Sequence, residues 1–189
     1  MTNSIMLVGV GGQGTILAGK ILTIGLMEAG YDVKMSEIHG MSQRGGSVTT
    51  HIRYSHEKVY SPVIEKGTAD VLVAFEKMEA LRYIDFLKKD GKIIVNDLEI
   101  PSTPITNGMC DYPQGILDEL QSKANVTILN AGIEAHNIGS AKVMNIILLG
   151  ALIKKMNLDS IDWTDIITKN VKSAFVQLNL KAIKRGMEL

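Results

Sequence analysis

The residues best suited to chemistry stand near the start of the chain, where Gly9-Val10-Gly11-Gly12-Gln13-Gly14 matches the pattern Gly-x-Gly-x-x-Gly. The motif follows a short apolar run and precedes a helical pattern, which is the context in which such a turn binds phosphate or carboxylate. The structural alternative is that these glycines only let the helix pack close to the sheet. The candidate ligand-binding residues of this turn are Gly9, Gly11, Gly12, Gln13 and Gly14.

A second glycine-rich segment, residues 39–46, separates two strand patterns and has almost nothing to pack in a core. The loops after the first two strands of a doubly wound sheet lie side by side at its carboxyl edge, so the two segments should meet. Arg44 and the surrounding amides would then suit phosphate groups. A solvated loop charge or a contact to a partner chain explains Arg44 nearly as well. The candidate residues here are Ser42, Gln43, Arg44, Gly45, Gly46 and Ser47.

A nicotinamide dinucleotide site is the obvious alternative use of the first turn. Glu37 ends the second strand pattern, where an acid could bind a ribose hydroxyl. Two features count against this interpretation. The glycine-rich segment directly after Glu37 would crowd the adenosine end, and no later stretch offers residues for hydride transfer. A free-standing NAD(P)-dependent reductase therefore stays as the alternative hypothesis.

The sequence contains a single cysteine, Cys110. One thiol cannot form an intrachain disulfide, a cysteine-rich zinc site or a cysteine-held iron–sulfur cluster. The four histidines are scattered and form no His-Glu-x-x-His pattern, so we expect no metal site on this chain. If the protein takes part in electron transfer, its metal centres must lie on another chain.

Charge and composition exclude several classes of partner. Lysine plus arginine equals aspartate plus glutamate at 20 each, so no overall field draws the protein to nucleic acid or to an anionic membrane surface. Every apolar run is broken well before a membrane-spanning length, and the first residues do not resemble a signal peptide. We therefore expect a cytoplasmic protein.

Strand and helix patterns alternate along the chain, which predicts a mainly parallel sheet. The fold class we expect is α/β, a single doubly wound sheet with helices on both faces in a Rossmann-like three-layer sandwich. With 46% hydrophobic residues, the 189-residue chain can bury one sizeable core, so we expect residues 1–189 to form one domain. The predicted strands are residues 4–9, 31–37, 47–54, 69–75, 92–96 and 125–130, and residues 59–64 are an edge strand or an extended connection.

The helical patterns follow the strands in order. Residues 97–113 hold most of the prolines and read as a long connection with at most a short strand. The most apolar helix, residues 140–156, should be buried against the sheet. The predicted helices are residues 15–29, 76–89, 114–124, 140–156, 162–172 and 177–185.

Taken together, residues 9–14 and 36–48 resemble the gamma-type domain of 2-oxoacid:ferredoxin oxidoreductases. Within that family, the form EIHGMSQRGGSV, with YSPVI and FEKMEALR downstream, is similar to the small subunit of the indolepyruvate type. The resemblance covers nearly the whole chain, including Gly139-Ser140 and Asn145, and is loosest in the last helices.

The resemblance implies a division of labour between subunits. The larger subunit of this family carries thiamine diphosphate and iron–sulfur clusters, decarboxylates the 2-oxoacid and passes electrons to ferredoxin, while the acyl group goes to coenzyme A. This chain shows no Gly-Asp-Gly thiamine segment, so we expect it to hold no tightly bound cofactor and no catalytic residue.

Three roles remain open for the small subunit. The family implies that its domain helps to hold coenzyme A, and the two glycine-rich segments with Arg44 are compatible with that ligand. The segment around Arg44 could instead press against the thiamine-bearing partner, with no ligand of its own. A pure assembly module is the third hypothesis, and homodimerisation of the isolated chain is left open.

Overall fold

The computed structural model describes residues 2–40 and 45–189. In these residues six strands form one sheet in the order β2-β3-β1-β4-β5-β6. Strand β1 is paired in parallel with β4, β4 with β5, and β5 with β6, whereas β3 runs antiparallel to both β1 and β2. The strands are β1 (Asn3–Val10), β2 (Asp32–His39), β3 (Ser47–Ser55), β4 (Ala69–Ala74), β5 (Leu87–Asn96) and β6 (Asn125–Leu129).

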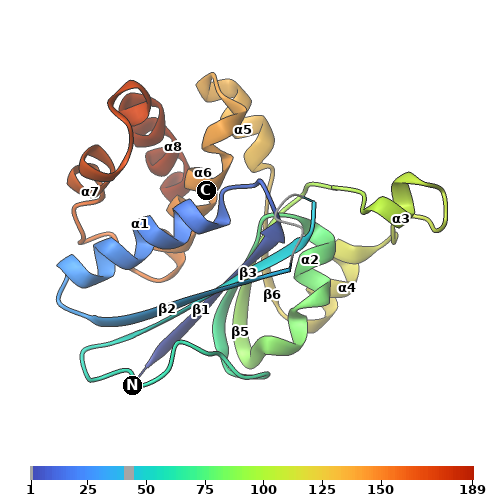
Figure 1. Cartoon of the computed structure of the whole chain (residues 1–189), viewed down its shortest axis with the longest axis horizontal. Helices are drawn as coiled ribbons and strands as arrows, with labels where there is room; N and C mark the ends of the chain where they lie inside the picture. The colour runs from blue at the N-terminus through green and yellow to red at the C-terminus, as the bar shows by residue number, and fades with distance from the viewer. Residues whose placement is uncertain (1, 41–44) are drawn as a thin grey trace.

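Helices cover both faces of the sheet, which confirms the three-layer α/β architecture (Figure 1). One face carries α1 (Thr15–Glu28), α5 (Ala131–Ile138), α6 (Met144–Lys155), α7 (Trp163–Asn170) and α8 (Val176–Glu188). The other face carries α2 (Lys77–Arg82) and α4 (Ile116–Lys123). Short elements are α3 (Thr103–Thr106) and the 3₁₀ turns η1 (Ile84–Phe86), η2 (Ala141–Val143) and η3 (Ser173–Phe175).

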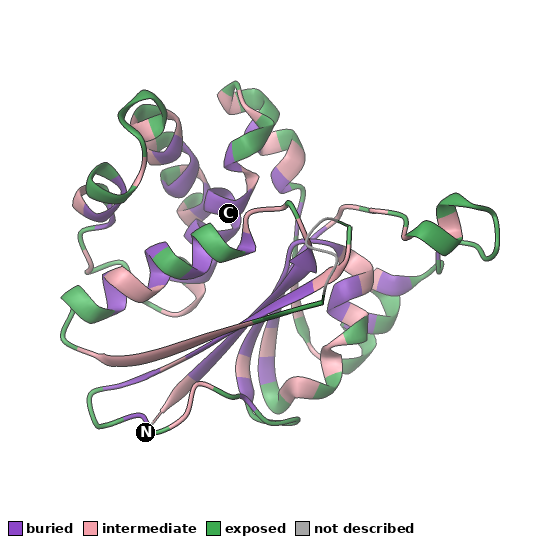
Figure 2. Ribbon diagram, viewed as in Figure 1, coloured by how far each residue is buried: buried purple, intermediate pink, exposed green. Residues whose placement is uncertain are grey.

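Strand β1 lies at the centre of the sheet and is buried on both sides (Figure 2). Its side chains alternate between two apolar clusters. Ile5 and Leu7 belong to the larger cluster under α1 and α6, and Met6 and Val8 belong to the cluster under α2 and α4. A strand covered on both faces reads as a continuous apolar run, which is why the sequence pattern revealed it.

The predicted helix at residues 76–89 was wrong in its second half. Helix α2 ends at Arg82, and the chain enters β5 at Leu87, whose φ of −71° and ψ of 134° are extended. Leu87 pairs with Ala69 of β4, and the ladder shifts register before Val71. The end of the predicted helix therefore becomes part of a strand that pairs with β4, although its apolar spacing also suits a helix. Asp90 and Gly91, which separate the predicted helix 76–89 from the predicted strand 92–96, lie inside β5.

The long apolar helix also begins later than predicted. Gly139 ends α5 in the left-handed conformation at φ 108°, and the Ser140 hydroxyl then accepts a hydrogen bond from the Lys142 amide. Helix α6 starts only at Met144, after η2. Helix α5 was not predicted from the sequence. Residues 59–64 form a connection rather than a strand, and the connection from residue 97 to 113 holds α3 instead of a strand.

Every helix within the described parts of the chain is too short or too polar to cross a membrane.

Candidate functional site

The first glycine-rich turn joins the carboxyl end of β1 to the start of α1. Gly14 precedes the helix in the left-handed region at φ 81°, and no side chain caps the helix. The first turn of α1 also contains no acidic residue. The amides at the start of a helix have no partner inside the helix, and the helix dipole makes this end positive. The start of α1 can therefore receive an anion.

The two glycine-rich segments do meet. The Gly11 amide donates to the Gly46 carbonyl at 2.8 Å, and the Gly45 amide donates to the Gly11 carbonyl at 3.3 Å. The reason differs from the predicted one. Strand β3 lies between β1 and β2 and runs antiparallel to β1, so Ser47 begins β3 opposite Val10, where β1 ends.

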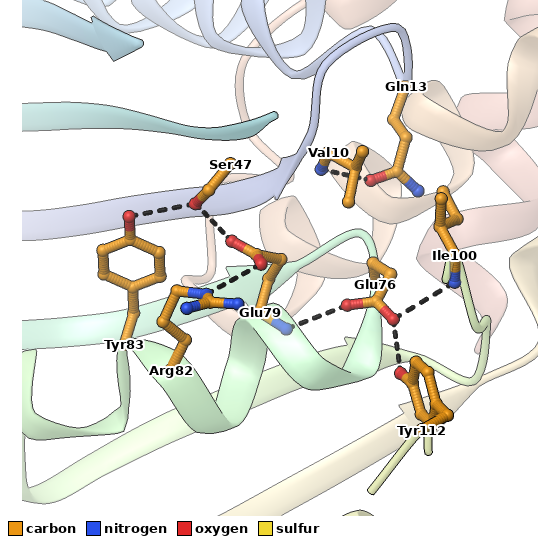
Figure 3. Close-up of polar contacts among 9 residues, drawn as sticks. All are labelled: Val10, Gln13, Ser47, Glu76, Glu79, Arg82, Tyr83, Ile100 and Tyr112. Atoms are coloured by element: carbon orange, nitrogen blue, oxygen red, sulfur yellow. Dashed lines mark hydrogen bonds and ion pairs between the residues drawn. The ribbon is translucent and has the colours of Figure 1, made fainter. Parts of the chain in front are cut away.

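Gln13 serves the turn itself. Its side-chain Oε1 accepts from the Val10 amide at 2.7 Å (Figure 3), and its Nε2 donates to the Phe75 carbonyl at 2.8 Å. A Cβ on Gly9 would lie 2.8 Å from that Oε1 and 3.0 Å from the Phe75 Cβ. Gly9 and Gln13 thus fasten the turn to the end of β4, and the side chain of Gln13 has both polar atoms engaged.

The backbone amides of the turn divide into two groups. The Gly11 amide is used by Gly46, and the Gln13 amide donates to the Val10 carbonyl at 3.2 Å. Within residues 2–40 and 45–189, the amides of Gly12 and Gly14 donate no hydrogen bond. Of the predicted turn residues, Gly12 and Gly14 therefore keep donors for a ligand.

Ser47 contacts a buried carboxylate on the opposite face of the sheet. Its hydroxyl donates to Glu79 of α2 and lies 3.0 Å from the Tyr83 hydroxyl (Figure 3). The Glu79 side chain is 3% exposed, and its other oxygen accepts from the Arg82 Nε at 2.9 Å. Ser47 therefore anchors the start of β3 to α2. The remaining predicted residues Ser42, Gln43 and Arg44 lie outside the described residues.

A second buried carboxylate, Glu76, holds the end of β4. It accepts from the Glu79 amide at 2.9 Å, from the Ile100 amide at 3.3 Å and from the Tyr112 hydroxyl (Figure 3). Burial and then this hydrogen bond to Glu76 raise the pKa of Tyr112, so the phenol stays protonated and donates. Physical reasoning from the sequence missed both glutamates. The signal was available in the sequence, because Glu76 directly follows a buried strand and precedes a helical pattern. A side-chain oxygen at that position can accept from an amide in the first turn and cap the helix.

Hollows flank the glycine-rich turn on both sides. One of about 340 Å³ lies toward β2 and β3 and is lined by Gly11, Thr15, Ile16, His39 and Val48, among others. Another of about 360 Å³ lies toward η2 and α6 and is lined by Gly12, Gly14, Leu17, Lys142, Met144 and Asn145, among others. Residues of the turn thus line two separate hollows.

Asn145 of α6 is the polar residue most closely tied to the turn. Its side chain is buried, and its Nδ2 donates to the Gly14 carbonyl at 3.1 Å. Its Oδ1 is buried and accepts no hydrogen bond from the described residues. An unpaired buried acceptor is uncommon in native proteins and is costly unless a ligand or water satisfies it.

The dinucleotide hypothesis receives no geometric support. Glu37 is paired with Thr50 of β3, so a whole strand separates it from β1. A dinucleotide-binding acid stands at the end of the strand next to the glycine-rich turn. Glu37 therefore does not occupy the ribose-binding position.

Metal ligands do not gather in the described residues: no group of three or more histidine, cysteine, aspartate or glutamate side chains there could hold an ion. Cys110 is exposed. The one thiol in the sequence does not fit the ligand requirement of an iron–sulfur cluster.

Sequence comparison reveals extended similarity to known proteins. Residues 4–189 match the family model for pyruvate ferredoxin/flavodoxin oxidoreductase. The indolepyruvate oxidoreductase subunit IorB of Archaeoglobus fulgidus is 38% identical, over 98% of this chain and 94% of the relative. The corresponding subunit of Pyrococcus horikoshii is 35% identical over the same shares. The 2-oxoglutarate synthase subunit KorC of Methanothermobacter marburgensis is 28% identical, over 100% and 97%.

Solved structures give the same fold. The gamma subunit of a keto/oxoacid ferredoxin oxidoreductase from Geobacter sulfurreducens is 25% identical with a TM-score of 0.72, covering 98% of this chain and 96% of that one. The fold also matches a 2-oxoglutarate:ferredoxin oxidoreductase from Magnetococcus marinus, solved with 2-oxoglutarate, coenzyme A and succinyl-CoA bound. That likeness is 20% identical with a TM-score of 0.78, over 99% of this chain and 30% of the other.

Proposed function

Because this chain belongs to the pyruvate ferredoxin/flavodoxin oxidoreductase family, we propose that it is the small subunit of an enzyme that oxidises an aryl pyruvate, with indolepyruvate the preferred substrate. In the proposed reaction the 2-oxoacid loses CO₂, its acyl group is transferred to the thiol of coenzyme A, and the electron pair released passes to ferredoxin.

The observation that carries the proposal is similarity along the whole chain to indolepyruvate oxidoreductase subunits. The identities to four of them are 34 to 38%. Those to 2-oxoglutarate synthase subunits are 27 to 31%. The resemblance of residues 36–48 to the indolepyruvate type favours the same assignment.

The redox chemistry belongs to a larger partner subunit in this proposal. This chain has one exposed cysteine, which does not fit a cluster. We therefore assign thiamine diphosphate and the iron–sulfur clusters to the partner. Ferredoxin interacts with the complex and not directly with this chain. No catalytic step is assigned to a residue of this chain.

Coenzyme A is the ligand that we propose for the glycine-rich turn. Its diphosphate suits the open start of α1, where the amides of Gly12 and Gly14 remain available. Gly9, Gly11 and Gln13 shape the turn, and Gly45, Gly46 and Ser47 fix the neighbouring backbone. From sequence alone, Ser42, Gln43 and Arg44 are proposed to complete the site.

Reconstitution with the large subunit tests the function. The isolated chain should contain no iron, thiamine or flavin and should not oxidise any 2-oxoacid. Addition of the large subunit should give ferredoxin reduction that depends on coenzyme A and is faster with indolepyruvate than with pyruvate or 2-oxoglutarate. Turnover by this chain alone would contradict the subunit role, and a preference for 2-oxoglutarate would contradict the substrate.

Arg44→Ala separates a ligand role from an interface role. A charge-assisted bond to phosphate is worth about 1.5 to 3 kcal/mol, so its loss should weaken coenzyme A affinity roughly ten- to hundredfold. Subunit association, measured by sedimentation, should barely change. Lys181→Ala, at an exposed position on α8, is the control for lost charge. Weakened assembly with normal coenzyme A dependence would instead place Arg44 at the interface.

A further inference from the structure

A surface groove lies between the start of α1 and the segment that joins α7 to α8. It has a volume of about 420 Å³ and is lined by residues of α1, η2, η3 and the ends of α7 and α8 that face them. Its apolar side chains are Leu17, Val143, Val171 and Phe175. Leu17 is 40% exposed and Phe175 is 43% exposed, and neither belongs to the apolar clusters of the core. Single exposed apolar side chains are ordinary, but a hollow that gathers several is typical of a binding surface.

The charge of this groove is positive. Lys142 and Lys172 line it and are exposed, and none of the described residues that line it is an aspartate or a glutamate. Neither ammonium group is paired with a carboxylate in the described part of the chain. The Asn179 side chain is engaged within its own segment, because its Nδ2 donates to the Phe175 carbonyl at 2.8 Å. The two lysines therefore favour a carboxylate on the partner that covers the apolar side chains.

The groove adjoins the edge of the molecule that carries the glycine-rich turn. Leu17 lies in the first turn of α1, and Leu17 and Lys142 also line the hollow of about 360 Å³ beside Gly12 and Gly14. In the proposed function, an acyl group formed on the larger subunit is transferred to a coenzyme A held at this turn. The transfer requires the two reacting groups to meet, so the larger subunit must lie against this edge. The larger subunit is therefore the partner that we expect to cover the groove.

The backbone that carries Phe175 is already fixed in the free chain. The Phe175 amide donates to the Lys172 carbonyl at 2.8 Å and closes the turn of η3. The Val171 amide donates to the Ile167 carbonyl at 3.0 Å at the end of α7. An aromatic side chain on a preorganised backbone loses little freedom on binding, and such residues often dominate the energy of an interface. Phe175 should therefore contribute most to a contact in this groove.

We propose that this groove is a docking site for the larger subunit, and that it receives a segment in which an apolar side chain stands beside an aspartate or glutamate. The apolar side chain contacts Leu17, Val143 and Phe175. The carboxylate pairs with Lys142 and Lys172. The proposal deepens the proposed function and rests on it for the identity of the partner. It gives α1, η2 and η3 a role in assembly that is separate from the contacts of the turn with coenzyme A.

Sedimentation of the full chain with the large subunit tests the groove. Phe175→Ala should raise the dissociation constant roughly ten- to hundredfold, as expected for a central aromatic contact. Met27→Ala removes an exposed apolar side chain at the other end of α1 and is the matched control.

Lys172→Glu tests the charge of the groove and keeps the test valid if Phe175→Ala perturbs η3. It should also weaken association, and its effect should shrink as salt is added, because salt screens exposed charges. Lys89→Glu, at an exposed position in β5, is the matched control and should leave association unchanged.

The outcomes distinguish the docking groove from the proposed function. Wild-type affinity in both Phe175→Ala and Lys172→Glu, in complexes that still oxidise indolepyruvate, would overturn the groove and leave the function intact. Self-association of the isolated chain that is lost in Phe175→Ala, with normal affinity for the large subunit, would show that a second copy fills the groove. Normal assembly with weakened coenzyme A affinity in Lys172→Glu would reject docking in favour of a ligand site. Failure of the wild-type chain to bind the large subunit would contradict the proposed function itself.

Discussion

Asn145 and Gly14 are 131 residues apart in the chain, yet the Asn145 Nδ2 donates to the Gly14 carbonyl at 3.1 Å. This contact joins the start of α6 to the start of α1. A Cβ on Gly14 would lie 2.6 Å from the same Nδ2 and 3.1 Å from the Asn145 Cγ. The glycine is therefore required both by its φ of 81° and by the asparagine that fills the space beside it.

Gly14→Ala should destabilise the protein by about 2 to 5 kcal/mol, because a left-handed alanine costs roughly 1 to 2 kcal/mol and the overlap adds about 1 to 3 kcal/mol. Gly12→Ala is the matched control, since its φ is also positive, at 107°, but nothing lies within 4 Å of an added Cβ. Urea unfolding measures both. Equal losses of stability in the two variants would mean that Asn145 moves aside without cost.

The fold was readable from the sequence where burial and local pattern agree. Strand β1 and helix α1 were predicted within one residue of their observed ends, because a strand buried on both faces and a helix ended by Gly30 leave clear patterns. Strand β5 was misread at its start. Leu87 is extended and pairs with Ala69 of β4, and such long-range pairing leaves no local signal.

The site was readable only in part, for the same reason. The glycine-rich turn stands in one stretch of sequence, and its partner segment follows within a few tens of residues. Two other features depend on how distant elements pack. These are the position of β3 between β1 and β2, and the position of Lys142 and Asn145 beside the turn. A lone asparagine in an apolar helix indicates a buried polar contact, but the sequence does not name its partner.

Helices α6 and α8 pack backbone against backbone, which leads to a second prediction. A Cβ on Gly150 would lie 2.3 Å from the Ile183 carbonyl oxygen and 2.9 Å from the Gly186 Cα. Gly150→Ala should therefore cost about 1 to 3 kcal/mol. Gly132→Ala in α5, where nothing lies within 4 Å, should instead stabilise the protein by up to about 1 kcal/mol through helix propensity.

The same pair of variants tests the proposal that residues 1–189 form one folding unit. The fluorescence of Trp163, the one tryptophan in the chain, and far-ultraviolet circular dichroism should follow one unfolding transition. Gly150→Ala should shift that whole transition. Separate transitions by the two probes would show that α8 and its neighbours unfold independently of the sheet.

Tyr112→Phe is the third prediction and tests the buried carboxylate of Glu76. The variant removes one of three hydrogen-bond donors to a carboxylate whose residue is fully buried, so it should cost about 1 to 2 kcal/mol. Tyr60→Phe, at a residue that is 85% exposed, should have almost no effect. Denaturant midpoints compare the two. A neutral Tyr112→Phe would mean that the two backbone amides satisfy Glu76 by themselves.

The fourth prediction concerns pH and His51. This histidine is buried in β3, and its Nδ1 accepts a hydrogen bond from the Ile64 amide at 3.1 Å. Burial lowers the pKa of His51 in the folded protein, so the ring stays neutral at a pH where the unfolded chain already binds a proton. The free energy of unfolding should therefore fall as the pH drops below the unfolded value of about 6.5. One such group contributes a slope of at most about 1.4 kcal/mol per pH unit.

His51→Asn keeps an acceptor for Ile64 but does not titrate, so its stability should depend less on pH between 7 and the folded-state pKa than that of the wild type. His136→Asn, at an exposed position on α5, should keep the wild-type dependence. Urea unfolding across this range measures all three proteins, and an unchanged slope in His51→Asn would show that other groups cause the loss of stability in acid.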